Sequence, residues 1–186
     1  RPEYDWKSIQ QQNPLDEEMK LRIGNMAGVS AILEQKNTKV LLPDVYDGDA
    51  LWSTSISGIP PELADVMEAS VIEGSITYED LTDGSRIILN KKSFNWSPDW
   101  KVGSVIRMIL QDGDKEIPME FQVAAIADPP AYLSHYASFM LPSSVLEEIC
   151  SNNQTYYYSI DADKEKLEAV EENLLSLTKE NRFLRL

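Results

Sequence analysis

The alternation of apolar and polar positions is clearest between residues 72 and 130, where it predicts a small β unit. Runs rich in β-branched residues are bounded there by Gly and Asp turns, which is typical of short strands. The runs are residues 87–89, 105–110 and 117–127. Asp112-Gly113 between the last two runs is a strong signal for a β-hairpin. Asp128-Pro129-Pro130 ends the last strand, since proline cannot donate to a strand ladder.

The segments on either side of this unit predict a mixture of helices and strands. Apolar residues recur at helical spacing after the helix start at Asp16 and again over residues 164–179, where Leu167, Val170, Leu174 and Leu177 share one face. Further helices are predicted at residues 61–68 and 142–150, and strands at 29–42, 52–59, 139–141, 156–161 and 183–186. For residues 29–42, a hairpin and one long bent strand both fit the pattern. The order of elements predicts an α+β protein with two lobes.

The predicted domain organisation has three parts. Residues 1–15 are a lead-in, residues 16–71 and 136–186 form an α+β lobe, and residues 72–135 form an inserted β-rich lobe. No apolar run approaches the roughly 20 residues needed to span a bilayer. Because the chain starts at Arg1, without Met, we expect it to be a fragment of a longer protein.

Composition narrows the range of partners. The 186 residues are 42% hydrophobic, which is typical of a folded chain. The formal charge of −14 argues against nucleic-acid binding, since phosphate backbones need a basic surface. It fits either a well-hydrated surface or a cationic ligand. The single cysteine, Cys150, excludes an internal disulfide and a cysteine-based zinc site. Its setting after Val145-Leu146-Glu147-Glu148-Ile149 favours a small apolar helix residue over a nucleophile.

No common catalytic or nucleotide-binding motif occurs in the chain. G-x-G-x-x-G, the P-loop pattern and the G-x-S-x-G elbow are all missing from the sequence. The one histidine, His135, could act as a base with Ser134 or Ser138, although a surface or hinge histidine is the favoured interpretation.

Two other groups of residues are candidate binding sites. Asp44, Asp47 and Asp49 form an acidic loop that could bind calcium, but their spacing departs from the EF-hand loop, so a solvated loop is favoured. Trp96 and Trp100 flank Ser97-Pro98-Asp99. They are either core residues of the β unit, which we favour, or contacts for a ligand or partner.

A series of short motifs, in order and with approximate spacing, covers about three-quarters of the chain. The motifs are Gly28-Val29-Ser30-Ala31-Ile32, Ser57-Gly58-Ile59, Ile72-Glu73-Gly74 followed by Glu79-Asp80, Ile87-Ile88-Leu89-Asn90, Val102-Gly103-Ser104-Val105-Ile106, Phe121-Gln122-Val123-Ala124-Ala125-Ile126 and Phe139-Met140-Leu141-Pro142. Taken together, the region from Asp16 to Ile160 resembles the large extracytoplasmic domain of FtsX-like or MacB-like ABC transporter permeases.

The resemblance implies a domain between two transmembrane helices, with a porter-like βαβ lobe and an inserted, mostly β second lobe. It implies a membrane protein whose domain lies outside the cell or in the periplasm. The implied partners are a cytoplasmic ATP-binding subunit, a second permease copy, and a peptide, drug or extracytoplasmic protein. It implies no catalytic residue, cofactor or metal in this domain. Residues 91–101 depart from the family pattern, because they carry two Trp and a Pro.

Three functional hypotheses follow. The first is a non-catalytic extracytoplasmic permease domain that couples ATP hydrolysis in the cytoplasm to export, substrate sensing or partner control. The alternative is a small extracytoplasmic hydrolase or metal-binding domain that uses His135 or the loop from Asp44 to Asp49. A third is a free-standing adhesion or binding module. Chain ends that lie side by side would favour the permease domain, whereas a pocket joining His135 to a carboxylate and a nucleophile would favour the enzyme.

Overall fold

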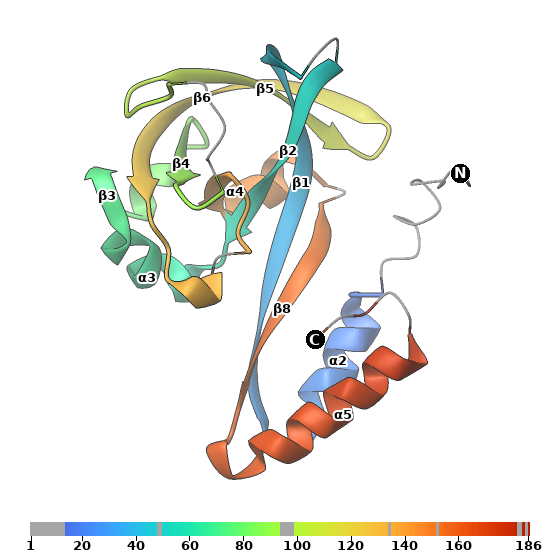
Figure 1. The fold of residues 1–186 in the computed structure, drawn as a ribbon. Coiled ribbons are helices and arrows are strands. Elements are labelled where there is room, and N and C mark those ends of the chain that lie inside the picture. Colours follow the sequence, from blue (N-terminus) through green and yellow to red (C-terminus); the bar gives the residue numbers. More distant parts are fainter. Residues whose placement is uncertain are drawn as a thin grey trace. The chain divides into compact units, whose positions relative to one another are not determined.

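The computed structural model describes residues 14–47, 50–93, 99–133, 135–151, 153–181, 184 and 186. The chain forms two compact units (Figure 1). Unit 1 comprises Arg1–Glu34 and Thr155–Leu186, and unit 2 comprises Gln35–Gln154. Unit 2 is inserted in the chain between the two segments of unit 1 and is mostly strand, which confirms the predicted α+β fold class.

Six strands close into a ring in unit 2. In pairing order they are β1 (Val29–Asp47), β2 (Ala50–Ile59), β7 (Phe139–Pro142), β4 (Arg86–Asn90), β6 (Lys115–Ala127) and β5 (Val105–Asp112). The ring closes where β5 pairs with β1, at Val40↔Leu110 and Leu41↔Ile109. A seventh strand, β3 (Val71–Gly74), pairs with β6 outside the ring. Closure gives the ring strands partners on both edges.

The main core of unit 2 comes from alternate residues of the six ring strands. Side chains two residues apart point to the same face of a strand, and in a closed ring that shared face is the interior. Each large apolar side chain buried there contributes about 1.5–3 kcal/mol. The core residues include Val40, Leu42, Ile56, Ile87, Leu89, Ile106, Met108, Leu110, Phe121, Val123, Phe139 and Leu141. Helix α4 (Ser143–Ile149) adds Val145 and Leu146, and Cys150 follows it.

The hairpin between β5 and β6 has a two-residue loop. Pairing runs from Val105↔Gln122 to Asp112↔Lys115, so Gly113 and Asp114 form the turn. Gly113 has a φ of 64°, and a positive φ at the first central position is the requirement of a type II′ turn. The hairpin predicted at Asp112-Gly113 is therefore confirmed.

Strand β4 is buried on both faces, because Ile88 and Asn90 are as inaccessible as Ile87 and Leu89. The short helical segments of unit 2 contribute further buried residues, namely Leu63, Met67, Leu81 and Leu133. These segments are η1 (Pro61–Leu63), α3 (Ala64–Ala69), η2 (Glu79–Leu81) and η3 (Ala131–Leu133). The Tyr78 hydroxyl, just before η2, donates a hydrogen bond of 2.8 Å to the Ile59 carbonyl at the end of β2.

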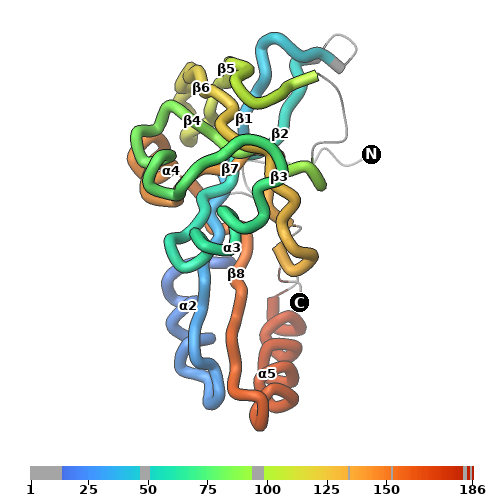
Figure 2. Tube along the Cα trace, turned by 90° about the vertical axis from the view of Figure 1, so that its left-hand side faces the viewer, coloured from blue at the N-terminus to red at the C-terminus, as the bar shows by residue number. Residues whose placement is uncertain are grey.

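Unit 1 consists of two helices and a pair of strands. Helix α2 (Glu17–Gly24) is followed by residues 29–34 of β1, and β8 (Gln154–Ala162) is followed by η4 (Lys164–Lys166) and α5 (Leu167–Glu180). The Asp16 side chain caps α2 by accepting from the Met19 backbone N–H at 2.8 Å. Strands β1 and β8 are hydrogen-bonded neighbours and run side by side (Figure 2).

Among the described residues, the buried cluster of unit 1 is small. Ile23, Leu177 and Leu184 are buried, and partly buried residues from α2, β1, β8 and α5 pack against them. Val170 and Leu177 are buried on the predicted face of α5. Leu167 lies on the same face but is 56% exposed, so burial on this face begins at Val170. It is the first residue of α5 and precedes the part of the helix that packs.

Several sequence expectations differ from the structure. Residues 29–47 form one strand, which selects the long strand over the hairpin, and Asp44 lies in this strand and not in a loop. The chain passes from one unit to the other between residues 34 and 35 and between residues 154 and 155. The boundaries expected for the lobes lay between residues 71 and 72 and between residues 135 and 136. The reason for this difference is that β2 and β7, assigned to the first lobe, pair with each other and complete the ring of unit 2. No helix among the described residues is long and apolar enough to cross a membrane.

Candidate functional site

His135 follows η3 and is half-buried beside Tyr136, with ring centroids 5.3 Å apart. Its burial lowers the pKa of the imidazole from the usual 6.5. Of its two proposed partners, Ser134 lies outside the described residues. The Ser138 hydroxyl is buried, donates to the Ser93 carbonyl at 3.1 Å, and lies 3.3 Å from the Thr54 hydroxyl oxygen. These contacts hold Ser138 in a structural network that fixes the start of β7.

Asp44 forms an ion pair with Arg107 on β5. The Arg107 Nε donates to Asp44 Oδ2 at 2.8 Å, and Nη2 donates to Oδ1. This hydrogen bonding raises the pKa of the Arg107 guanidinium. The side chain of Asp47 and all of Asp49 lie outside the described part of the chain. Within that part, no group of three His, Cys, Asp or Glu side chains could hold a metal ion.

Trp100 lies against the core of unit 2, where it is partly buried. Its ring centroid is 5.6 Å from that of Phe139, at an interplanar angle of 46°. A contact between Trp100 and a ligand or partner stays a prediction, and Trp96 lies outside the described residues. Cys150 is fully buried, which agrees with the predicted small apolar residue, and its burial raises the pKa of the thiol.

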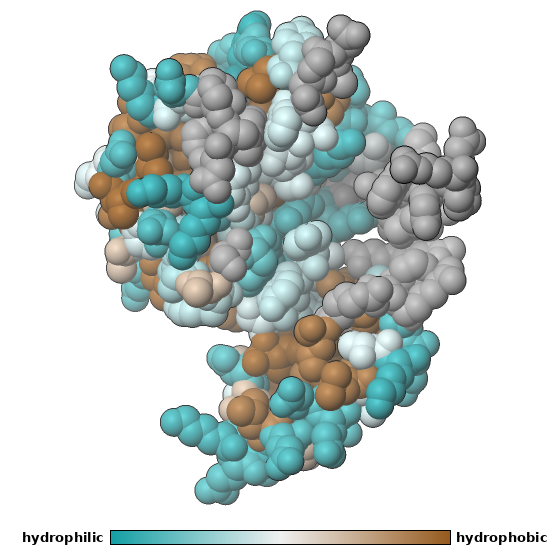
Figure 3. Space-filling model, in the orientation of Figure 1, coloured by the Kyte–Doolittle hydropathy of each residue, from teal (hydrophilic) through white to brown (hydrophobic). Residues whose placement is uncertain are grey.

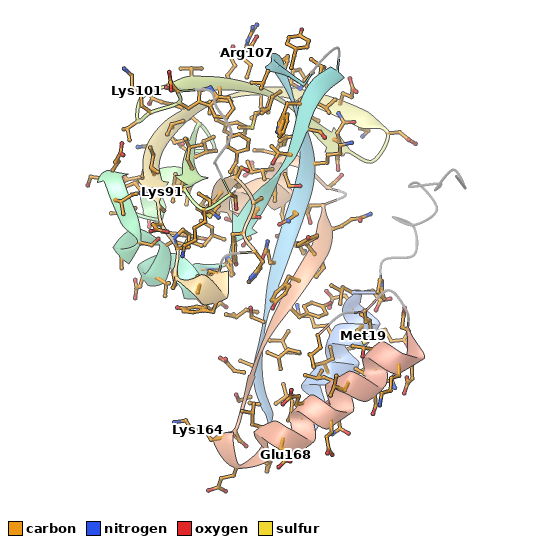
Figure 4. The ribbon with its side chains drawn as sticks, viewed as in Figure 1. Met19, Lys91, Lys101, Arg107, Lys164 and Glu168 are labelled. Atoms are coloured by element: carbon orange, nitrogen blue, oxygen red, sulfur yellow. The ribbon has the colours of Figure 1, made fainter. Side chains whose placement is uncertain are left out.

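A shallow hollow of about 450 Å³ lies between α3 and the end of β6. Its lining residues are Asp65, Val66, Ala69, Ser70, Asp128 and Pro130. The Ser70 hydroxyl donates to the Met67 carbonyl at 2.7 Å, and Lys92 Nζ lies 3.5 Å from the Asp128 carboxylate. The lining therefore holds two carboxylates, Asp65 and Asp128, and a hydroxyl that is engaged with the backbone. Lys101 and Arg107 lie elsewhere in unit 2 (Figure 4), whereas Lys91 follows β4, and its backbone N–H donates to the Ala127 carbonyl at the end of β6 at 2.8 Å.

The two described ends of the chain meet in unit 1. Leu15, before α2, and Leu184, after α5, pack in the same apolar cluster with Ile23 and Leu177. The Tyr158 hydroxyl donates to the Asp16 carbonyl at 3.0 Å, and Arg22 of α2 pairs with Glu180 of α5 at 2.7 Å. Unit 1 shows both apolar and strongly hydrophilic surface on the face drawn in Figure 3.

A polar contact that the sequence does not reveal joins three elements of unit 1. Lys20 Nζ on α2 lies 2.7 Å from Glu34 Oε2 on β1, and the Thr155 hydroxyl on β8 donates to Glu34 Oε1. The Glu34 side chain is only 14% exposed. Glu34 and Thr155 are separated by 121 positions in the chain, so no local sequence pattern could have paired them.

Comparisons with known proteins give structural likenesses at low sequence identity. No protein-family model and no curated protein sequence matches the chain. The chain is similar to the extracellular domain of the noncanonic ABC-type transporter YknZ from Gram-positive bacteria, with a TM-score of 0.46, 16% identity, and coverage of 91% of this chain and 87% of that one. It is also similar to the periplasmic region of MacB from Actinobacillus actinomycetemcomitans, with a TM-score of 0.44, 15% identity, and coverage of 86% and 71%.

Proposed function

We propose that this chain is a non-catalytic extracytoplasmic domain of an ABC transporter permease. The observation that carries the proposal is the meeting of the two described ends in unit 1, through the cluster that holds Leu15 and Leu184. A domain carried between two membrane-spanning segments must return its chain to the surface from which it left. Adjacent ends satisfy that requirement.

Two glycines in the motifs that carry the family resemblance have a structural role. A Cβ at Gly58 would lie 2.8 Å from Ser143 Cα, and a Cβ at Gly74 would lie 2.4 Å from the Ala124 carbonyl oxygen. Both glycines therefore permit close backbone approach, of β2 to α4 and of β3 to β6. Motifs of this kind specify a scaffold, which agrees with a family that has no catalytic residues in this domain.

The candidate residues are held in structural contacts or buried, which supports a non-catalytic role. Asp44 is bound by Arg107, Ser138 belongs to the network around β7, and Cys150 is buried with a raised pKa. A thiol of raised pKa is a poor nucleophile, since the thiolate is the reactive form. We assign the domain the coupling of cytoplasmic ATP hydrolysis to export, substrate sensing or partner control.

The partners of this function are an ATP-binding subunit in the cytoplasm and a second permease copy. A peptide, drug or extracytoplasmic protein would contact the domain itself, with Trp96 and Trp100 as contact residues. The acidic composition, with a formal charge of −14, favours cationic ligands through electrostatic attraction.

Cysteine labelling of the complete gene product in its own cells tests the location. Leu21→Cys in unit 1 and Tyr132→Cys in unit 2 replace side chains that are each 65% exposed. A membrane-impermeant maleimide should label both variants on intact cells as strongly as on permeabilised cells. Cys150 is buried, so the unsubstituted protein gives the background. Labelling that requires permeabilisation would overturn the proposal.

A further inference from the structure

We propose that Lys20, Glu34 and Thr155, the Glu34 clamp, link helix α2 to both strands that continue from unit 1 into unit 2. The clamp is a conformational device, and it goes beyond the proposed function: it stands on the geometry of unit 1, whatever the cellular location of the chain.

The contacts of the clamp are short and partly shielded from water. The Lys20 ammonium lies 2.7 Å from Glu34 Oε2, and their side chains are 33% and 14% exposed. The second carboxylate oxygen, Oε1, accepts from the Thr155 hydroxyl. Both oxygens of one carboxylate are thus engaged, by groups from two different elements. Hydrogen bonds to an ionised acceptor are roughly twice as strong as neutral ones, and lower water access strengthens them further.

The clamp lies at the two points where the chain passes between unit 1 and unit 2. Glu34 is the last residue of the first segment of unit 1, and Thr155 is the first residue of the second segment. Strand β1 continues past Glu34 without a break and pairs with β2 from Asn37 onward. Because β1 is continuous, we expect a displacement of α2 to reach residues 37–42 through the Glu34 side chain. This is a contiguous physical path of the kind that carries coupling between sites.

A second ion pair on the same helix provides a matched control. Arg22, two residues after Lys20, pairs with Glu180 at 2.7 Å, but these side chains are 51% and 56% exposed. That pair joins α2 to α5 and involves neither strand. Exposed pairs of this kind contribute little to stability. Loss of the Arg22 pair should therefore leave β1 and β8 unaffected.

Hydrogen–deuterium exchange on the 186-residue chain tests the clamp by comparing Lys20→Met with Arg22→Met. Lys20→Met should speed amide exchange about tenfold in residues 30–36 and 155–158, and to a smaller extent in residues 37–42 of β1. Arg22→Met should change exchange in these strands by less than about twofold. Glu34→Gln, which keeps the shape of the side chain and removes its charge, should reproduce the Lys20→Met pattern.

The distribution of faster exchange decides the result. Faster exchange confined to α2 would show that Lys20 only stabilises its own helix, and this overturns the clamp. Faster exchange that stops at residue 34 would show that the effect of Lys20 does not reach the ring of unit 2, and this would also overturn the clamp. Equal effects of Lys20→Met and Arg22→Met would do the same. Because the experiment uses the isolated chain, its outcome is independent of the labelling test of cellular location.

Discussion

Gly28, between α2 and β1, meets two constraints that can be separated by substitution. Its φ is 104°, and a Cβ there would lie 2.7 Å from Lys166 Cβ. Gly103 has a φ of 89° but nothing within 4 Å of a Cβ. Gly103→Ala therefore tests backbone strain alone and should cost about 1–2 kcal/mol in free energy of unfolding. Gly28→Ala adds a collision and should cost about 1–3 kcal/mol more.

Urea unfolding followed by circular dichroism measures both costs. The clash at Gly28 involves Lys166 at the end of η4, beside the hydrogen bond of 2.8 Å from the Asp163 N–H to the Gly28 carbonyl. Equal losses of unfolding free energy in the two variants would mean that η4 moves away freely. The close packing of Gly28 against η4 would then not contribute to stability.

His135 gives a pH-dependent prediction at the same scale. Its burial lowers the pKa below 6.5 in the folded chain. Between the lowered value and 6.5 the unfolded chain binds more protons, so the free energy of unfolding should fall as the pH drops below 6.5. The stabilisation is fully present above that pH. His135→Asn should remove this part of the pH dependence.

The single histidine of the sequence makes this measurement direct. An NMR titration of the imidazole protons reports one pKa, which we expect to be below 6.5. A pKa at or above 6.5 would contradict the burial of the ring. Hydrogen bonds lower the pKa of acids such as Asp80 and Asp83, which moves their titration away from this window.

At the scale of elements, strand β5 separates interior from exterior positions in one short sequence. Ile106 is 3% exposed and belongs to the ring core, whereas its neighbour Val105 is 61% exposed. Ile106→Ala should cost about 2–5 kcal/mol in free energy of unfolding, because it leaves a cavity. Val105→Ala should change it by less than about 0.5 kcal/mol. Similar effects from the two substitutions, measured by urea unfolding, would contradict the assigned face.

Local patterns identified most elements, and pairing between distant strands explains most of what they missed. The hairpin of β5 and β6 was predictable because its turn lies between its strands. By contrast, the parallel pairing of β2 with β7, such as Ser57↔Met140, joins residues 83 positions apart, and no local signal marks it. The same reason hides the closure of the ring and the place of β2 in unit 2. Asp44 was assigned to a loop because acids and a glycine disfavour strands, but pairing with β2 extends β1 to Asp47.

The candidate sites show the same dependence on tertiary structure. Cys150 was predicted as a small apolar helix residue because Val145, Leu146 and Ile149 precede it at helical spacing, and these residues pack in or against the ring core together with it. The clamp at Glu34 could not be predicted, because its partners come from α2 and β8, on either side of the whole of unit 2. A lysine, a glutamate and a threonine at unrelated positions carry no motif.

At the scale of the whole molecule, the two units differ strongly in the size of their cores. Among the described residues, unit 2 contains a cluster of 15 buried residues, whereas the buried cluster of unit 1 has three, Ile23, Leu177 and Leu184. A small unit that buries few apolar side chains is marginally stable, because burial barely offsets the entropy of ordering the chain. We therefore expect unit 1 to open at a lower urea concentration than unit 2.

Two leucine substitutions test this order of unfolding. Leu177→Ala in α5 should lower the midpoint of the first transition, and Leu110→Ala in β5 the midpoint of the second, each by an amount that corresponds to about 2–5 kcal/mol. Amide exchange at increasing urea assigns each transition to its residues, with those of α2 and α5 losing protection before those of β5 and β6.

The clamp limits how independent the transitions are, because β1 runs through both units. Opening of unit 1 should therefore also weaken protection at residues 37–42 while β5 and β6 stay protected. A single transition in which α5 and β6 lose protection together would contradict the division into units of unequal stability.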